Sequence, residues 1–296
     1  MKKVVARMLG GLGNQLFIIS AAYTLASKDS SEIVLDTREY KTYKTRRFEL
    51  LEIINDDNVR LYDEKKDKSY VFDVSRFAYH IAQKFINPQK KMSVILSKTG
   101  LVYTKRNAEG MNVDIHRDTA YLYGYFQDAR MAKRVKALLN EKIRNFDFPY
   151  VLDPNMNYIG ISIRWGLDYI KQGWPICSKE YFENGVNEIV HEKYGNEKVC
   201  VLVFSDEIEK AKQLEFDAEK EFVEGLSAAQ QLNLMKKCQD FVISNSSFSW
   251  WGAFLGATDN SIVIAPNIWY DTKEPTENTL LTYENMRIRD MGWNNI

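Results

Sequence analysis

A turn rich in polar side chains follows an apolar run near the carboxyl end of the chain. The apolar run is Phe241-Val242-Ile243, and the segment after it reads Asn245-Ser246-Ser247-Phe248-Ser249-Trp250-Trp251-Gly252. In open α/β sheets, ligands lie at the carboxyl ends of strands, and the N-terminus of a following helix offers unpaired N–H groups to an anion. Core packing explains part of the tryptophan pair but not the Asn-Ser-Ser turn. We therefore predict an anion-binding site at this strand end.

A second strand end is predicted to carry Arg164 and, four residues later, Asp168. An arginine there has the reach and the planar fork of donors to bind a diphosphate. Asp168 could act as a general base, or it could simply form an ion pair with Arg164, and the sequence favours neither. A third strand end carries Ser205 and Asp206, which could contact a ligand or only cap a helix that begins near Glu207.

A glycine-rich loop, Gly10-Gly11-Leu12-Gly13-Asn14-Gln15, follows the first predicted strand and opens a helix, as a phosphate-binding loop does. Asp36 ends the next strand, at the position of the ribose-binding acid in dinucleotide folds. Leu16 occupies the place of that fingerprint's third glycine, and the loop lacks the Gly-Lys-Ser/Thr of a Walker motif. The alternative is a tight strand-to-helix turn with Asn14 as its cap.

An alternation of strands and helices must position these residues. Strands are predicted at 2–9, 32–36, 120–126, 158–164, 198–204, 241–244 and 261–265, and helices at 14–27, 74–85, 128–144, 178–193, 207–213, 228–237 and 250–257. The stretch 146–155 contains two prolines and no helical period, so we predict a linker there. The expected fold class is α/β, with Rossmann-like domains at 1–150 and 151–296.

The composition is that of an ordinary soluble globular protein and excludes several function classes. Forty basic and forty acidic residues cancel, which argues against nucleic acid as a partner, and no apolar stretch approaches the ~20 residues of a membrane span. Cys177, Cys200 and Cys238 are widely spaced and suit a reducing cytoplasm better than a disulfide framework. The three histidines form no ligand-spaced cluster and no Asp-x-Asp pair occurs, so neither a metal nor another cofactor is expected.

Seven segments, taken in this order, resemble the α-1,2-fucosyltransferases of glycosyltransferase family 11. They are Gly10–Phe17, Gly124–Gln127, Ile176–Phe182, Phe204–Asp206, Leu234–Cys238, Asn245–Ala253 and Ile262–Tyr270. The ordered set spans nearly the whole chain, which makes it more specific than any one segment. The resemblance implies two Rossmann-like domains facing across a cleft (a GT-B-like fold), with an acceptor-side N-terminal domain and a C-terminal domain that binds GDP-fucose.

The resemblance also implies inverting, metal-independent transfer of L-fucose from GDP-fucose to the 2-hydroxyl of a terminal galactose in a glycan. It implies a cytoplasmic enzyme with at most peripheral membrane association. Arg164 matches the family's donor-phosphate arginine, and Asn14 matches a loop asparagine that reaches the donor. The expected catalytic residues are Asp168 as the base, Arg164 and Asn14. The expected donor-binding residues are Gly11, Gly13, Asn14, Gln15, Arg164, Ser205, Asp206, Asn245, Ser246, Ser247 and Trp250.

One motif departs from the family pattern His-x-Arg-Arg-Gly-Asp-Tyr. This chain has Ser162 and Trp165 in place of the histidine and the second arginine, and Leu167 is inserted before the aspartate. Losing one charge-assisted contact costs ~1.5–3 kcal/mol of phosphate binding. Two alternatives therefore stay open: a transferase that uses another nucleotide sugar or acceptor, and a non-catalytic paralogue that binds GDP or glycan. A nicotinamide oxidoreductase is a more distant third.

Overall fold

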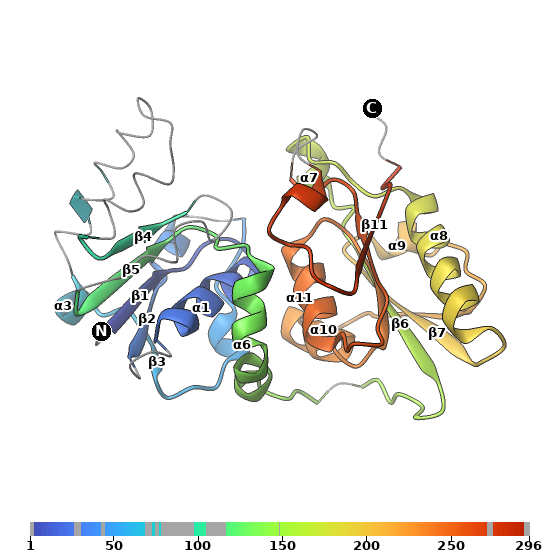
Figure 1. The fold of residues 1–296 in the computed structure, drawn as a ribbon, viewed down its shortest axis with the longest axis horizontal. Helices are drawn as coiled ribbons and strands as arrows, with labels where there is room; N and C mark the ends of the chain where they lie inside the picture. Colours follow the sequence, from blue (N-terminus) through green and yellow to red (C-terminus); the bar gives the residue numbers. More distant parts are fainter. Residues whose placement is uncertain are drawn as a thin grey trace. The chain divides into compact units, whose positions relative to one another are not determined.

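The computed structural model describes residues 3–26, 31–42, 45–68, 73–74, 77, 98–104, 117–147, 149–270 and 275–292. The chain divides into two compact units, Met1–Arg144 and Asn145–Ile296, each built on its own parallel sheet (Figure 1). The predicted class of two Rossmann-like α/β domains is therefore confirmed. Within the described ranges, no helix is both long enough and apolar enough to cross a membrane.

In the described part of the N-terminal unit, five parallel strands form a sheet in the order β3-β2-β1-β5-β4. The strands are β1 (Lys3–Arg7), β2 (Glu32–Asp36), β3 (Val59–Leu61), β4 (Leu101–Tyr103) and β5 (Thr119–Tyr123). The helices are α1 (Leu12–Ala26), α2 (Leu50–Ile53), α3 (Glu64–Asp67) and α6 (Ala129–Lys142), with the 3-10 turn η1 (Arg38–Lys41). The strand order reverses between β1 and β5, so the ligand position of this sheet lies at their carboxyl ends.

The sheet of the C-terminal unit has six parallel strands among the described residues, in the order β11-β10-β9-β6-β7-β8. The strands are β6 (Asn157–Ile163), β7 (Val199–Ser205), β8 (Glu219–Phe222), β9 (Asp240–Ile243), β10 (Val263–Pro266) and β11 (Met286–Arg289). The helical elements are α7 (Leu167–Lys171), α8 (Lys179–Ile189), η2 (Val190–Tyr194), α9 (Ile208–Ala211), α10 (Ala228–Met235), α11 (Ser247–Gly256) and η3 (Thr276–Asn278). Counted from β6, this is the strand order of a dinucleotide-binding fold, with its reversal between β6 and β9.

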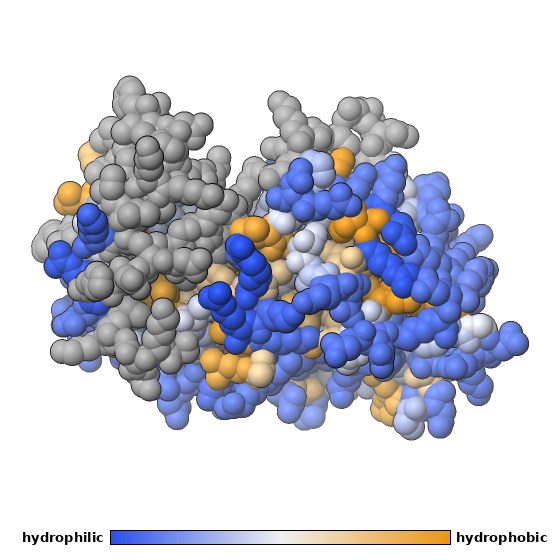
Figure 2. Space-filling model, in the orientation of Figure 1, coloured by the Kyte–Doolittle hydropathy of each residue, from blue (hydrophilic) through white to orange (hydrophobic). Residues whose placement is uncertain are grey.

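Apolar side chains hold each sheet to its helices. Val4 and Ala6 of β1 are fully buried, and α1 packs on this strand with almost all of its residues buried. In the C-terminal unit, Ile161 of β6 and Val201 of β7 share a core with Phe182 of α8. Strands covered on both faces in this way explain the nearly continuous apolar runs in the sequence. The face of the C-terminal unit that is coloured in Figure 2 is by contrast mainly hydrophilic.

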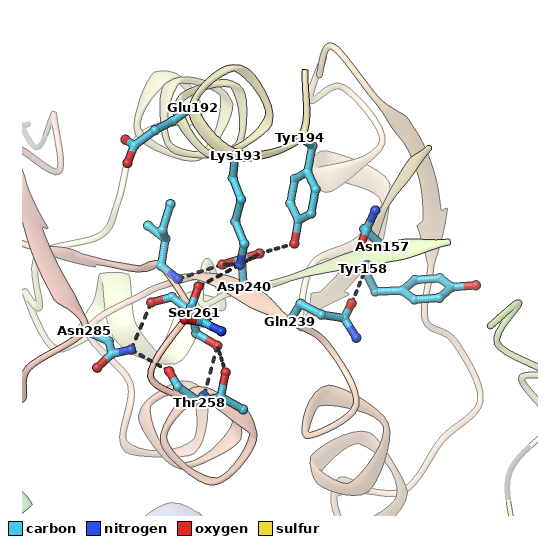
Figure 3. Close-up of polar contacts among 12 residues, drawn as sticks. Asn157, Tyr158, Glu192, Lys193, Tyr194, Gln239, Asp240, Thr258, Ser261 and Asn285 are labelled. Atoms are coloured by element: carbon cyan, nitrogen blue, oxygen red, sulfur yellow. Dashed lines mark hydrogen bonds and ion pairs between the residues drawn. The ribbon is translucent and has the colours of Figure 1, made fainter. Parts of the chain in front are cut away.

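A buried carboxylate anchors the amino end of β9 (Figure 3). The Asp240 side chain accepts hydrogen bonds from Lys193 Nζ at 2.8 and 2.9 Å, from the Tyr194 hydroxyl and from the Ile262 N–H at 2.6 Å. Burial, together with this carboxylate, raises the pKa of the Tyr194 hydroxyl, which therefore remains a donor. Lys193 and Tyr194 belong to η2, the π-helical continuation of α8. The cluster thus fixes α8 at the sheet edge opposite the carboxyl ends.

The strands predicted from the sequence are present with small shifts at their ends, but four short strands are not predicted by its pattern. These are β3, β4, β8 and β11, which form the two edges of each sheet. An edge strand is covered on fewer sides and needs less apolar sequence, as β8 shows, because only Phe222 of its four residues is partly buried. Helix α11 begins at Ser247 rather than at the predicted Trp250, so Ser247 lies in its first turn. The predicted helix 74–85 falls almost entirely outside the described residues.

A second buried carboxylate ties β1, β3 and α3 together in the N-terminal unit. Asp67 accepts hydrogen bonds from Lys3 Nζ at 2.7 Å, from Arg60 Nη1 at 2.6 Å and from the Asp63 N–H at 2.9 Å. Arg60, together with Lys3 and the Asp63 N–H, holds the pKa of the Asp67 carboxyl well below its usual range. Since the folded pKa lies below the unfolded one, the stabilisation is complete above the unfolded value of about 4 and is lost as pH falls.

We expect Asp67→Asn to lower the free energy of unfolding by about 2–3 kcal/mol at neutral pH, because the charge-assisted bonds to Lys3 and Arg60 are weakened. The deficit relative to wild type should shrink as pH falls below about 4, where the wild-type carboxylate loses the same advantage. Thermal unfolding measured across this range tests the sign. Asp57→Asn, an exposed carboxylate, is the control and should change little. A deficit that stays constant with pH would contradict the electrostatic account.

Candidate active site

The reversal of strand order between β6 and β9 brings three predicted strand ends into contact. Arg164 directly follows β6, Asp206 follows β7, and residues 244–246 follow β9. The Arg164 guanidinium lies 4.8 Å from the centre of the Tyr169 ring. The Tyr169 hydroxyl donates to the Asn245 carbonyl at 3.4 Å. The cationic and hydroxyl-rich segments predicted from the sequence therefore share one edge of the C-terminal sheet.

Two carboxylates hold the Arg164 guanidinium. Its Nη2 donates to Asp168 Oδ2 at 2.5 Å, and its Nη1 donates to Asp206 Oδ2. The arginine side chain is only 18% exposed, so its orientation is well fixed. One positive and two negative charges meet here, and a bound diphosphate would compete with both carboxylates for the guanidinium. Of the two roles of Asp168 left open by the sequence, the structure shows the ion pair with Arg164.

Asp206 also fixes the backbone that follows Arg164. Its oxygens accept from the Trp165 N–H at 2.8 Å and from the Gly166 N–H at 3.0 Å. A Cβ at Gly166 would lie 2.5 Å from Asp206 Oδ2, so a larger residue would displace this carboxylate. The neighbouring Ser205 Oγ accepts from the Glu207 N–H at 3.0 Å, which is a local turn bond. Asp206 is therefore a positioning group for the arginine, a role that sequence reasoning about a helix cap does not predict.

Trp165, which stands where the family has its second arginine, turns into the core. Its Nε1 donates to the Cys177 carbonyl at 2.7 Å, and its ring meets the Phe182 ring edge-on at 5.7 Å between centroids. Trp165, the residue that departs from the family motif, thus packs the loop onto α8. At this motif Arg164 is the one guanidinium that remains.

Three buried hydroxyls join β6, β9 and α11. Ser249 Oγ lies 2.7 Å from Ser162 Oγ and 3.1 Å from Ser244 Oγ. Ser162 occupies the position of the family's histidine, and a side chain of this size lets the first turn of α11 approach the two strand ends. The network fixes the start of α11 beside Arg164's strand. Sequence reasoning missed Ser162 and Ser249 as a pair because they are far apart in the chain.

The N-terminus of α11 has no side-chain cap. Ser246 is its N-cap residue and makes no capping bond through its hydroxyl, and no side-chain hydrogen bond of Ser247 is found among the described residues. The N–H groups of a first helical turn have no acceptor within the helix. Their partial positive charge and the two hydroxyls suit a phosphate group. Ser246 and Ser247 are therefore placed where the sequence predicted an anion to bind.

Two residues predicted to contact the donor have side chains that serve the fold. Trp250 is fully buried, its Nε1 donates to the Leu281 carbonyl at 2.8 Å, and its ring stacks on Phe254 at 4.5 Å. Asn245 is also buried, and its amide donates to the carbonyls of Pro175 at 2.9 Å and Trp269 at 3.3 Å. Trp250 is a core residue, and Asn245 ties the turn to two neighbouring loops through its amide nitrogen, whereas its Oδ1 is buried and has no hydrogen-bond partner among the described residues. Contact of these two residues with the donor stays a prediction.

The glycine loop of the N-terminal unit positions Asn14 at the carboxyl ends of β1 and β5. Gly10 has φ +68°, and a Cβ there would lie 2.5 Å from Asn14 Nδ2. Asn14 Oδ1 accepts from Gln127 Nε2 at 2.8 Å. Gln127 belongs to the segment after β5 that resembles the family, yet its spacing alone gives no reason to pair it with Asn14. Gly11 and Gly13 shape the turn and the first residues of α1.

Gln15, predicted to contact the donor, is instead a buried structural residue. Its Nε2 donates to the carbonyls of Gly10 at 3.0 Å and Arg47 at 2.9 Å, and its Oε1 accepts from the N–H groups of Glu49 and Leu50. With its amide fully engaged and no exposed surface, Gln15 holds the glycine loop against the segment before α2. The amide of Gln15 is therefore occupied within the fold, and its contact with the donor stays a prediction.

Asp36 does not offer a free carboxylate to a ribose, as a dinucleotide-binding acid would. Arg38 binds both of its oxygens, through Nε at 2.9 Å and Nη2 at 2.9 Å. In the part of the chain that the structure describes, no group of three or more histidine, cysteine or acidic side chains is arranged to hold a metal ion.

Comparison with known proteins identifies the family. The family model described as Glycosyl transferase family 11 matches residues 4–287. The chain belongs to glycosyl transferase family 11. This family 11 chain is thus a glycosyltransferase, and the family predicted from its sequence is confirmed.

Two proteins of Escherichia coli are similar to this family 11 chain over nearly their whole length. An α-1,2-colitosyltransferase is 28% identical and covers 93% of this chain and 94% of its own. The O-antigen biosynthesis glycosyltransferase WbnK is 29% identical and covers 94% of this chain and 98% of its own.

Solved structures share the fold at low identity. Fucosyltransferase NodZ from Bradyrhizobium has a TM-score of 0.55 at 14% identity, covering 93% of this chain and 96% of its own. A variant of Arabidopsis thaliana FUT1 in complex with GDP has a TM-score of 0.53 at 12% identity, covering 88% of this chain and 70% of its own. These likenesses support the two-domain Rossmann-like architecture.

We expect Ser249→Ala to lower the free energy of unfolding by about 1–2 kcal/mol, because the buried hydroxyls of Ser162 and Ser244 lose their shared partner. Ser247→Ala, two residues away in the same helical turn, removes a hydroxyl without a found partner and should change stability by less than about 0.5 kcal/mol. Urea unfolding of the two variants beside wild type measures the difference. Equal losses would show that the network does not anchor α11.

Proposed function

We propose that this chain catalyses inverting, metal-independent transfer of L-fucose from GDP-fucose to the 2-hydroxyl of a terminal galactose in a glycan. The observation that carries the proposal is the position of Arg164 beside the uncapped N-terminus of α11, at the strand-order reversal of the C-terminal sheet. A guanidinium and a helical turn of N–H groups can bind the diphosphate and stabilise the negative charge that builds on it as GDP leaves.

Asp168 is our candidate for the general base. In the structure it shares Arg164 with Asp206. Phosphate oxygens that bind the guanidinium would weaken the bond to Asp168 and let this carboxylate accept a proton from the attacking sugar hydroxyl. The hydroxyl oxygen then forms the new bond to the anomeric carbon while the bond to the diphosphate oxygen breaks. A single displacement of this kind inverts the anomeric configuration.

The similar proteins support a GDP-sugar donor and a polysaccharide acceptor. NodZ has been soaked with GDP-fucose, and the Arabidopsis thaliana structure holds GDP. The name of WbnK refers to O-antigen biosynthesis. We therefore propose a growing surface polysaccharide as the acceptor and the cytoplasm, with at most peripheral contact with the membrane, as the location.

A second candidate function is transfer of another deoxysugar by the same site. Two observations favour it: one relative is an α-1,2-colitosyltransferase, and Trp165 leaves Arg164 as the motif's single guanidinium. A non-catalytic protein that binds GDP or glycan is the third possibility to be tested.

A donor screen tests the function. The purified protein, treated with EDTA, is incubated with a galactose-terminated oligosaccharide and GDP-fucose, GDP-mannose, a GDP-colitose donor or UDP-sugars, and products are identified by mass. We expect gain of one deoxyhexose from GDP-fucose, with activity unaffected by EDTA. Transfer from another donor alone would replace fucose as the substrate. Binding of GDP without transfer from any donor to a panel of acceptors would favour the non-catalytic alternative.

We expect Arg164→Ala to weaken GDP binding by roughly 10- to 150-fold, the equivalent of about 1.5–3 kcal/mol, because the phosphates lose a charge-assisted contact. Isothermal titration with GDP measures this change. Arg287→Ala is the matched control, since Arg287 also pairs with two carboxylates, Glu188 and Glu192, but in β11. The control should bind GDP as wild type does. Unchanged GDP affinity in Arg164→Ala would remove the diphosphate assignment.

A further inference from the structure

Five side chains form a row across the carboxyl end of the N-terminal sheet. The parallel register pairs Arg7 of β1 with Asp36 of β2, and Tyr103 of β4 with Tyr123 of β5. The same registers, continued by one residue, place Arg7 beside Tyr123 and Tyr62 beside Asp36. Side chains paired in register on neighbouring strands point to the same face of a sheet. We call these five residues the edge row.

Contacts within the edge row hold its charged groups and rings in place. The Arg7 guanidinium lies 5.6 Å from the centre of the Tyr123 ring, and the Tyr103 and Tyr123 rings are 5.3 Å apart. Arg38, from η1, binds Asp36 with two nitrogens and lies 4.2 Å from the centre of the Tyr62 ring. These contacts therefore fix the orientation of the rings and of the two guanidinium groups.

The charges of the edge row and of its partners in η1 cancel. Arg7 forms an ion pair with Glu39, and Arg38 forms one with Asp36. The row therefore offers no net positive charge to an acidic ligand. Arg7 Nε is buried and has no hydrogen-bond acceptor among the described residues. A buried donor without an acceptor costs free energy that a hydroxyl oxygen of a ligand, or a water molecule, can recover.

This chemistry matches a neutral sugar. A sugar ring has an apolar C–H face, which packs on an aromatic ring, and a rim of hydroxyls, which pair with guanidinium and carboxylate groups. The tyrosines and the charged pairs of the edge row supply both. Arg7, Glu39 and Tyr123 are each partly accessible.

We propose that the edge row is the binding subsite for the acceptor sugar and that it selects a neutral sugar over an acidic one. The proposal rests on the proposed function, which assigns the carboxyl edge of the C-terminal sheet to the donor. The corresponding edge of the N-terminal sheet is where a ligand of that unit binds in a fold of this type, and Asn14 and Gln127 lie at its strand reversal.

The test compares two tyrosines of β5 that point to the same face. Tyr123→Ala removes a ring of the edge row, whereas Tyr121→Ala removes an equal ring one pair of residues nearer the amino end. We expect Tyr123→Ala to raise the KM for a neutral galactose-terminated oligosaccharide about tenfold and to leave the Kd for GDP within about twofold of wild type. Tyr121→Ala should keep the wild-type acceptor KM. Thermal unfolding of both variants checks that they fold.

A direct measurement uses the wild-type protein and Arg7→Lys, which keeps the charge but loses Nε. Binding of the oligosaccharide in the presence of GDP is followed by saturation-transfer NMR, beside the same oligosaccharide ending in galacturonic acid. We expect the neutral sugar to bind at least tenfold tighter and Arg7→Lys to weaken it. Equal binding of both sugars, or no effect of Tyr123→Ala and Arg7→Lys, would overturn the proposal. Because this readout needs no sugar transfer, failure of the donor screen leaves it decisive.

Discussion

The reversal of strand order between β6 and β9 is the constraint on which the candidate active site depends. On the two sides of the β6–β9 pair, the chain connections run in opposite directions along the sheet. These connections therefore do not cross over the carboxyl ends of the two strands. In the C-terminal unit this leaves Arg164 and the start of α11 at one uncovered place. The buried Asp240 cluster holds the opposite end of β9, so the position of the strand, and with it the site, is fixed at both ends.

Arg164 combines a fixed orientation with a replaceable set of partners. Asp206 holds both the guanidinium and the backbone after it, whereas Asp168 contacts the guanidinium alone. An arginine already oriented loses less side-chain entropy when a phosphate binds, although the phosphate must then compete with carboxylates. The inward turn of Trp165 shows how the loop packs without a second arginine: the indole N–H donates to the Cys177 carbonyl and the ring packs edge-on against Phe182.

In both units the strand order reverses and leaves the carboxyl ends of two central strands open, but the side chains at these ends differ. The C-terminal edge carries hydroxyls, helix N–H groups and one guanidinium, which suits an anion. The N-terminal edge carries tyrosine rings and charge-balanced pairs. Gln15 makes the N-terminal arrangement possible, because its amide ties the glycine loop to the segment before α2 and so fixes Asn14 beside β5.

The sequence by itself determined the family, the fold class and the segments that carry the site, because apolar runs, glycines and strand-end polar residues are local signals. It did not reveal the edge strands, which need little apolar sequence, nor which polar residues serve the fold. The sequence predicts Trp250 and Gln15 as ligand contacts. It does not show that both side chains are buried and hydrogen-bonded to residues far along the chain. The pairing of Ser162 with Ser249 and the edge row likewise depend on strand register. Tertiary structure decided these points because a side chain's role follows from its partners, and sheet topology selects them.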